Sequence, residues 1–344
     1  MPSFGTGRIC TAPGPLDKAV RFFYANRRKV KEMKKIVAML LAILMVLSLA
    51  ACASGSDDTA TENKEAEQTV EIPDVPDYTG EDTSSIPGLE DGVFTVGMEC
   101  AYAPYNWMQM DDSNGAVPIS NMDGGYANGY DVMIAKRICE AYDWELEIVS
   151  SECDGLVTGI QSGVMDANIA GQSMTADRMT QVDMAGPYLY ATIVCVTTKD
   201  SEFADAKSIS ELAGGSCTAQ TGTIWYDSCL SQIPDADILP PAETAPAMIM
   251  QLQTGTVDFI CTDMPTAMGA VAKDDNLVIL NFSGTDGDFQ FADEAERAEN
   301  VNIGISVEKG NTALVDAINK VLSQLNEEQF NALMDQAIAI QPEI

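Results

Sequence analysis

Ile160–Arg178, IQSGVMDANIAGQSMTADR, is the stretch of sequence that decides the fold. A helical segment ends at Gly163, a glycine that suits a helix C-cap, and a buried apolar strand, ANIAG, follows it. The opening of this stretch is echoed by Leu252–Asp258, LQTGTVD, at an offset of 92 residues, and the echo enters the strand FICTD. The alternation of helical and strand segments predicts an α/β protein.

The preceding sequence shows the same alternation. A strand opens at Phe94, and residues 130–142, YDVMIAKRICEAY, have the apolar face of a helix. Trp144, Leu146 and Ile148 alternate with glutamates and predict another strand. We therefore expect two similar lobes with facing strand ends and a cleft between them. A repeated structural unit without a shared site is the alternative.

The offset of the echo also pairs Gly171 with Asp263, and each is expected where a strand ends and a helix begins. Open α/β sheets bind ligands at such strand ends. Thr175 is a predicted helix N-cap, so Arg178 falls at the third helical position, where a capping box prefers Glu or Gln. A cation on the positive end of a helix is unfavourable unless an anion binds there.

Arg178 on one lobe and Asp263 on the other suit a ligand with a carboxylate and an ammonium group close together. An α-amino acid fits that description. For either residue alone, a surface charge or a structural ion pair is the alternative.

Charge and residue content exclude several classes of protein. Nine of the 19 basic residues lie in residues 1–51, so residues 52–344 hold 10 basic and 50 acidic residues, a net charge of −40. Such a surface repels nucleic acid. The chain contains no histidine, which excludes histidine triads and imidazole metal ligands. No C-x-x-C pair occurs, and DDSNG at 111–115 lacks calcium-loop spacing, so we predict no metal site.

Residues 33–51 have the features of a secretory signal peptide. Lys34 and Lys35 form a basic end, and the apolar run reaches LAAC, which resembles the lipobox of bacterial lipoproteins. We expect cleavage before Cys52 and diacylation of that cysteine, which would hold the protein on the outer face of the cell membrane. An ordinary transmembrane anchor is the alternative.

The segments on either side of the signal peptide are not expected to be part of the folded lobes. Residues 1–32 precede a complete signal peptide, so we expect translation to begin at Met33. Residues 52–85 are acidic and poor in large apolar side chains, which predicts a disordered tether.

Seven cysteines follow Cys52, and an odd number cannot pair completely within one chain. Cys217 and Cys229 flank a predicted strand and turn and could form a disulfide. Buried free thiols are the favoured alternative.

Six motifs together match a known family. They are GVFTVGMECAYAPYNW (92–107), GYDV (129–132), DGLVTGIQSGVMDANIAGQSMTADR (154–178), VDMAGPY (182–188), GTVDFICTDMPTA (255–267) and NIGIS (302–306). On these motifs the chain resembles solute-binding protein family 3, the amino-acid-binding proteins of ABC importers, over essentially the full length of that family.

The resemblance implies the type II periplasmic-binding-protein fold. This fold is a two-lobed clamshell, with a mixed sheet flanked by helices in each lobe and two hinge strands. Lobe 1 would comprise 86–191 and 303–344, and lobe 2 would comprise 192–302. The two crossings between lobes would fall near 190–194 and 300–304.

The resemblance also implies how the constant part of the ligand is bound. The α-carboxylate would contact Arg178, Ser173 and the backbone of Gly171, and Asp263 would take the α-ammonium group. We expect Arg178→Ala or Asp263→Ala to abolish amino-acid binding and to leave the fold intact.

Other residues are expected to contact the ligand from both lobes. Gln220 opens the stretch that matches the glycine turn of the family, and Thr223 in that turn would add a carboxylate contact. Glu99 and Tyr102 stand where many relatives place an acidic residue and an aromatic ring that packs on the ligand. Cys153 stands where many relatives have an aromatic residue. A solvated charge at the cavity rim is the alternative for Glu99.

These features predict a monomeric, lipid-anchored binding protein without a cofactor. It would capture a polar or basic L-amino acid, most simply a basic or glutamine-like one, and deliver it to the membrane subunits of an ABC transporter. One alternative is an enzyme of the cyclohexadienyl dehydratase type, in which Glu99 would act as acid or base. The others are a ligand-sensing module for a signalling partner and a lipid-anchored adhesin.

Overall fold

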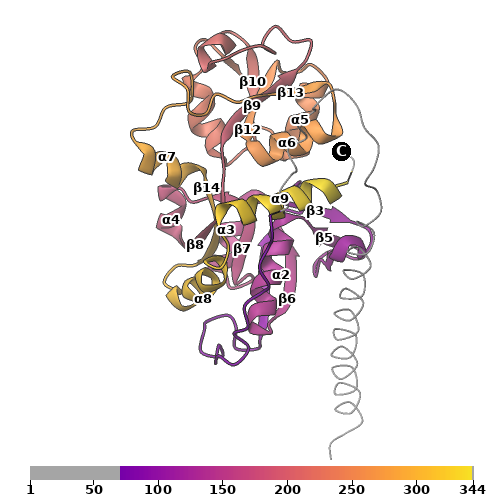
Figure 1. The fold of residues 1–344 in the computed structure, drawn as a ribbon, viewed down its shortest axis with the longest axis vertical. Helices are drawn as coiled ribbons and strands as arrows, with labels where there is room; N and C mark the ends of the chain where they lie inside the picture. Colours follow the sequence, from indigo (N-terminus) through magenta and orange to yellow (C-terminus); the bar gives the residue numbers. More distant parts are fainter. Residues whose placement is uncertain (1–69, 343–344) are drawn as a thin grey trace, which may run out of the picture. The chain divides into compact units, whose positions relative to one another are not determined.

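The computed structural model describes residues 70–342 of the chain (Figure 1). Two five-stranded mixed sheets organise these residues, with strand orders β6-β1-β7-β14-β8 and β11-β10-β12-β9-β13. A smaller, antiparallel sheet has the order β2-β3-β5-β4. Helices flank the two larger sheets (Figure 1), so the predicted α/β class with mixed sheets is confirmed.

We call lobe 1 the first five-stranded sheet, the smaller sheet and the helices packed on them. In the first sheet β1 is parallel to β6 and β7, and β14 is antiparallel to β7 and β8. The strands of lobe 1 are β1 (Val93–Met98), β2 (Ala101–Tyr102), β3 (Asn106–Gln109), β4 (Val117–Pro118), β5 (Tyr126–Asn128), β6 (Glu145–Ser150), β7 (Ala167–Ser173), β8 (Val182–Tyr190) and β14 (Asn302–Glu308). Its helices are α2 (Tyr130–Tyr142), α3 (Cys153–Gln161), α4 (Ala176–Gln181), α8 (Thr312–Leu322) and α9 (Glu327–Ile340), with a 3-10 turn, η1 (Ser113–Gly115).

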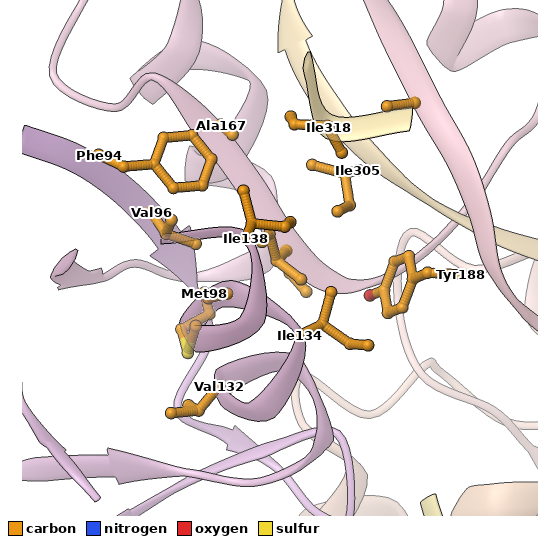
Figure 2. Packing of buried hydrophobic residues seen from close by; sticks show 14 of the residues in the cluster. Phe94, Val96, Met98, Val132, Ile134, Ile138, Ala167, Tyr188, Ile305 and Ile318 are labelled. Atoms are coloured by element: carbon orange, nitrogen blue, oxygen red, sulfur yellow. The ribbon is translucent and has the colours of Figure 1, made fainter. Parts of the chain in front are cut away.

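The core of lobe 1 forms where α2 packs on the first sheet. Ile134 and Ile138 are one turn apart on α2, and both are fully buried because they share the face that meets the sheet. Figure 2 shows them beside Phe94 and Val96 of β1 and Ile305 of β14. The apolar face predicted for residues 130–142 is thus the face that holds the helix to the sheet.

We call lobe 2 the second five-stranded sheet with its helices, which enclose a separate hydrophobic core. In this sheet β12 is parallel to β10 and antiparallel to β9. Its strands are β9 (Ile193–Thr198), β10 (Ser216–Thr218), β11 (Asp237–Ile238), β12 (Phe259–Asp263) and β13 (Leu277–Leu280). Its helices are α5 (Ala245–Gln253), α6 (Met264–Lys273), α7 (Glu294–Val301), η2 (Ile209–Leu212), the π-helix η3 (Trp225–Cys229) and η4 (Leu230–Gln232).

All cysteines among the described residues are free thiols. Cys217 and Cys229 are both fully buried in the core of lobe 2, so the structure has free thiols where a disulfide was the alternative.

The chain crosses between the two larger sheets twice. It leaves the first sheet at Tyr190, the last residue of β8, and enters the second at Ile193, the first residue of β9. It returns at Asn302, which opens β14 directly after α7. Asn302 pairs with Tyr190 in the ladder of β14 and β8, so the two crossings run side by side. The crossings expected near 190–194 and 300–304 fall on these segments.

The sequence echo corresponds to one structural unit present in both lobes. In each copy a helix, α3 or α5, ends in a turn at a glycine with positive φ, 71° at Gly163 and 69° at Gly255. In each copy an aspartate then accepts a hydrogen bond from a backbone amide of a neighbouring strand, Asp166 from β1 and Asp258 from β10, both at 2.8 Å. The strand that follows, β7 or β12, is buried along most of its length.

Residues 70–85 correct one expectation, because they are not a disordered tether. Arg137 of α2 donates hydrogen bonds to the carbonyls of Pro73 and Asp74 at 2.9 and 3.1 Å. The ring of Tyr78 packs on Tyr142, at 5.4 Å between ring centroids. Composition alone predicted disorder because the apolar residues of this segment are few, but those few dock onto lobe 1.

The predicted signal peptide, Cys52 and residues 1–32 lie outside the described residues. Within residues 70–342, no helix has the length and apolar character needed to span a membrane.

Candidate functional site

A cavity of about 470 Å³ is lined by elements of both lobes. In lobe 1 its walls come from Glu99 and Tyr102, which follow β1, and from α3, β7 and α4. In lobe 2 they come from residues 220–228 and Asn300. The volume lies within the range of roughly 300–1,000 Å³ that is usual for small-molecule sites. Eight of the nine residues predicted to bind ligand line it: Glu99, Tyr102, Cys153, Gly171, Ser173, Arg178, Gln220 and Thr223. The ninth, Asp263, does not.

Arg178 lies where the capping argument places it. Thr175 is the N-cap of α4, and its Oγ1 accepts a hydrogen bond from the Arg178 N–H at 3.2 Å. The guanidinium donates to the carbonyl oxygen of Ser173. Burial lowers the pKa of Arg178, and no ion pair is found for it within residues 70–342. The result is a half-buried cation without an acidic partner, which is a suitable site for a ligand carboxylate.

Gly171 differs in detail from the expectation. It lies two residues before the end of β7, has a φ of 61°, and donates its N–H to the Tyr188 hydroxyl at 3.1 Å. That amide is therefore engaged inside the protein. A Cβ at this position would lie 2.8 Å from Cε1 of Tyr102 and 3.1 Å from Cγ of Tyr105. Only glycine allows both this backbone conformation and this close ring packing.

Glu99 follows β1 and is half-buried in the cavity wall. Gln220 of lobe 2 donates from Nε2 to both of its carboxylate oxygens, at 3.3 and 3.2 Å. Burial raises the pKa of Glu99 from 4.5 to about 7; the hydrogen bond from Gln220 opposes this rise and the nearby Glu152 adds to it. Glu99 is therefore not a solvated rim charge, and its proton occupancy responds to whatever binds beside it.

Asp263 is fully buried beneath the aromatic wall of the cavity. The rings of Tyr102 and Tyr105 stack at 4.9 Å, and the Tyr105 hydroxyl donates to Asp263 Oδ2 at 2.5 Å. Asp263 is also the N-cap of α6, because its Oδ1 accepts from the N–H of Thr266 at 3.0 Å. Both oxygens thus have partners within the protein, and a ligand ammonium would have to approach past these tyrosines.

Cys153 and Thr223 stand on opposite lobes. Cys153 is the first residue of α3, and its Sγ would be 3.8 Å from a Cβ built on Gly222 of lobe 2. Thr223 donates its hydroxyl to the Gln220 carbonyl at 2.7 Å. Burial, with the charge of Glu99, raises the pKa of the Cys153 thiol to about 11, so the thiol is neutral at physiological pH.

Several residues in the wall were missed by sequence reasoning. Trp225 and Asp227 lie on η3, and this π-helix could not be anticipated because such helices are rare and lack a compositional signature. Asp154 opens a motif used for the family resemblance and adjoins Cys153, so that signal was available. Asp177 lies in the first turn of α4, where acidic residues are common for reasons of helix stability alone.

The charges of the cavity wall are unequal. Among the described residues that line it, Arg178 alone is basic, whereas Glu99, Asp154, Asp177 and Asp227 are acidic. The part of the chain covered by the structure holds no group of three or more His, Cys, Asp or Glu side chains placed to bind a metal ion. The arrangement suits a small ligand that carries one carboxylate and at least one positive charge.

Comparisons with known proteins give the same class of molecule. Residues 94–338 match the family described as bacterial extracellular solute-binding proteins, family 3. The L-cystine-binding protein TcyA of Bacillus subtilis is 25% identical over 296 residues, covering 86% of this chain and 94% of TcyA. An arginine-binding periplasmic protein of Mannheimia haemolytica is 26% identical, covering 67% of this chain and 85% of its own length. The structure of the arginine-bound form of truncated ArgBP from T. maritima superposes with a TM-score of 0.54 at 29% identity, over 69% of this chain and 98% of that truncated chain. These homologues are binding proteins and not enzymes.

Proposed function

The chain belongs to family 3 of the bacterial extracellular solute-binding proteins, and on this premise we propose that it captures a polar or basic L-amino acid for an ABC transporter. The ligand would bind in the cavity between the lobes. Arg178 and Thr223 would contact its α-carboxylate, Asp263 its α-ammonium group, and Glu99 its side chain.

One observation carries the proposal: among residues 70–342, Arg178 is a half-buried cation without an acidic partner, and the other charged side chains that line its cavity are acidic. A carboxylate at Arg178 satisfies the cation, and a cationic or polar side chain then meets Glu99. Charge-assisted hydrogen bonds contribute about 1.5 to 3 kcal/mol each, and a micromolar dissociation constant corresponds to about 8 kcal/mol. Two such anchors would supply a large share of the affinity.

The ligands of the similar proteins support this ligand class. The similar proteins named above bind cystine or arginine, which are amino acids with a second charged group. The acidic excess in the cavity wall favours a second ammonium or guanidinium group over a second carboxylate alone.

The cycle follows from the position of the cavity. An amino acid that contacts both lobes stabilises the closed arrangement, and the membrane subunits of the transporter would recognise that arrangement. We also propose a lipid on Cys52 and a location on the outer face of the cell membrane. Both rest on the signal peptide and lipobox pattern in the sequence.

A thermal-shift screen of the purified mature protein tests the function. The ligands are the twenty amino acids with cystine, ornithine and citrulline. We expect one or a few of them, led by arginine, lysine or cystine, to raise the unfolding midpoint by mass action. Arg178→Ala should remove the shift without lowering the midpoint of the unliganded protein by a comparable amount. The absence of any shift with the unsubstituted protein would contradict amino-acid binding.

A further inference from the structure

A buried carboxylate lies behind the cavity wall. Asp131, the second residue of α2, is fully buried, and both of its oxygens accept hydrogen bonds. Oδ1 accepts from the Tyr188 hydroxyl and Oδ2 accepts from Asn106 Nδ2, each at 2.7 Å. No ion pair is found for Asp131 within residues 70–342. A buried carboxylate without a cation is costly, and its place in the first turn of α2 and its two hydrogen bonds offset that cost.

The first branch of this network reaches β7. The Tyr188 hydroxyl gives its one hydrogen to Asp131 and accepts the N–H of Gly171 at 3.1 Å. Gly171 lines the cavity, has a φ of 61° and is packed under the ring of Tyr102. Asp131 therefore fixes, through one hydroxyl, the direction in which this backbone amide points.

The second branch reaches the turn after β1. The side chain of Asn106 donates to Asp131 from its nitrogen, and its oxygen accepts the N–H of Cys100 at 2.6 Å. Cys100 has a φ of 58°, a conformation that is uncommon for a residue other than glycine. The residues beside it in the cavity wall are Glu99 and Tyr102. Asp131 thus sets the orientation of the Asn106 amide, which in turn holds this strained turn.

We propose that Asp131 is a positioning residue for the amino-acid site, which holds two left-handed backbone positions of the cavity wall, Gly171 and Cys100, through Tyr188 and Asn106. The inference rests on the proposed function, since it concerns the same cavity. An asparagine at position 131 presents an N–H where one of the two donors needs an acceptor. That branch must then lose its hydrogen bond or reverse the bond's direction, and the cavity wall is held less firmly on that side.

The titrating groups around Asp131 define a ligand-free test. Burial raises the pKa of Asp131 to about 6; the hydrogen bonds from Tyr188 and Asn106 oppose this rise and the charge of Asp263 adds to it. Tyr188 and Tyr130 also face Asp131, and burial raises their pKa values above the ordinary value for tyrosine. Burial raises the pKa of the Cys100 thiol to about 12. Asp263 and Glu99 are thus the other carboxyl groups whose titration has to be distinguished from that of Asp131 by substitution.

The first experiment follows the backbone amide of Gly171 by NMR in the unliganded protein from pH 5 to 8. We expect its resonance to move with a midpoint near pH 6 in the unsubstituted protein and in Glu99→Gln. The movement should be lost in Asp131→Asn and in Tyr188→Phe. Tyr130→Phe is the matched control, because it removes a buried hydroxyl that bonds the Tyr188 carbonyl and lies outside both branches. A midpoint that persists in Asp131→Asn would overturn the proposal whether or not the cavity binds an amino acid.

The second experiment measures affinity for L-arginine by calorimetry at pH 7.5. We expect Asp131→Asn and Tyr188→Phe to weaken binding about 10-fold or more, the equivalent of one charge-assisted hydrogen bond, and Tyr130→Phe to weaken it less than about 3-fold. Unchanged affinity in Asp131→Asn, or equal losses in Tyr188→Phe and Tyr130→Phe, would overturn the proposal. If the unsubstituted protein binds no amino acid, the proposed function fails, and the Gly171 titration still decides whether the network exists.

Discussion

The two copies of the helix, glycine turn and strand unit differ at the paired positions Gly171, which lines the cavity, and Asp263, which is buried behind its wall. In lobe 1 this position is Gly171, where the absence of a side chain lets two tyrosine rings pack on the backbone. In lobe 2 it is Asp263, whose side chain caps α6 and accepts a hydrogen bond from Tyr105. The same framework therefore carries a glycine packed under aromatic rings at one strand and a buried, hydrogen-bonded carboxyl group at the other.

This difference gives the two positions different surroundings. The backbone of Gly171 lies against the Tyr102 and Tyr105 rings, whereas Asp263 places a buried carboxyl group, whose pKa is raised by burial, beneath Tyr105. Under the proposed function, Asp263 would meet the ligand ammonium group and Arg178 its carboxylate. Tyr105 touches both positions: its ring packs on Gly171 and its hydroxyl bonds Asp263. Substitutions at Gly171 and Asp263 therefore test whether the two copies of the unit have different roles.

The largest expected effect is at Gly171. In Gly171→Ala the new methyl group lies in the left-handed region and 2.8 Å from the Tyr102 ring. We expect a loss of about 2 to 5 kcal/mol in the free energy of unfolding, from backbone strain and overpacking together. Urea denaturation measures it. Gly163→Ala is the matched control, because its φ is 71° but no atom lies within 4 Å, so about 1 to 2 kcal/mol is expected. Equal losses would show that the close ring packing imposes no constraint.

The next largest effect is at Asp263. We expect Asp263→Ala to lower the free energy of unfolding by about 2 to 4 kcal/mol, because α6 loses its N-cap and the buried Tyr105 hydroxyl loses its acceptor. This revises the expectation that the substitution leaves the fold intact. Arg178→Ala, also measured by urea denaturation, should lose much less, although both variants should lose amino-acid binding. If Asp263→Ala had the same free energy of unfolding as the unsubstituted protein, Asp263 would have no structural role.

The smallest effect concerns the pH dependence of Glu99. Its pKa is raised in the folded state, so its contribution to stability is fully present below pH 4.5 and is lost as the pH rises through about 7. Thermal unfolding of the unliganded protein should show this loss, and Glu99→Gln should abolish the part between pH 6 and 8. A cationic ligand favours the ionised form, so affinity for L-arginine should rise up to about 10-fold from pH 6 to 8. An affinity measured by calorimetry that does not depend on pH would show that Glu99 does not contact the ligand side chain.

Sequence alone predicted the elements whose signals are local. The helix predicted at residues 130–142 and the strand FICTD match α2 and β12, because one has a clear apolar face and the other a continuous apolar run before Asp263. Thr175 was predicted as an N-cap. Arg178 follows it by three residues, which is the spacing at which the Thr175 hydroxyl accepts the Arg178 N–H.

Features that depend on distant partners could not be predicted in the same way. The burial of Asp263 depends on Tyr105, 158 residues away, and nothing local indicates that its two oxygens are already engaged. The Gly171 amide is likewise held by Tyr188 of another strand. No strand was predicted between residues 111 and 128, where the structure has β4 and β5. These two short strands are held by pairing with each other, and β5 also pairs with β3.

The N-terminal segment, residues 70–85, determines where mechanical load enters the folded part of the chain. Arg137 and Tyr142 hold this segment against α2, and Gln329 of α9 donates a hydrogen bond to the Glu71 carbonyl at 3.0 Å. Tension applied to the chain before Val70 therefore enters through lobe 1, at α2 and α9. Gln341, at the C-cap of α9, donates to the Gly269 carbonyl of α6 at 2.9 Å. A pull on the N-terminal side therefore reaches lobe 2 through this contact as well as through the two crossing strands.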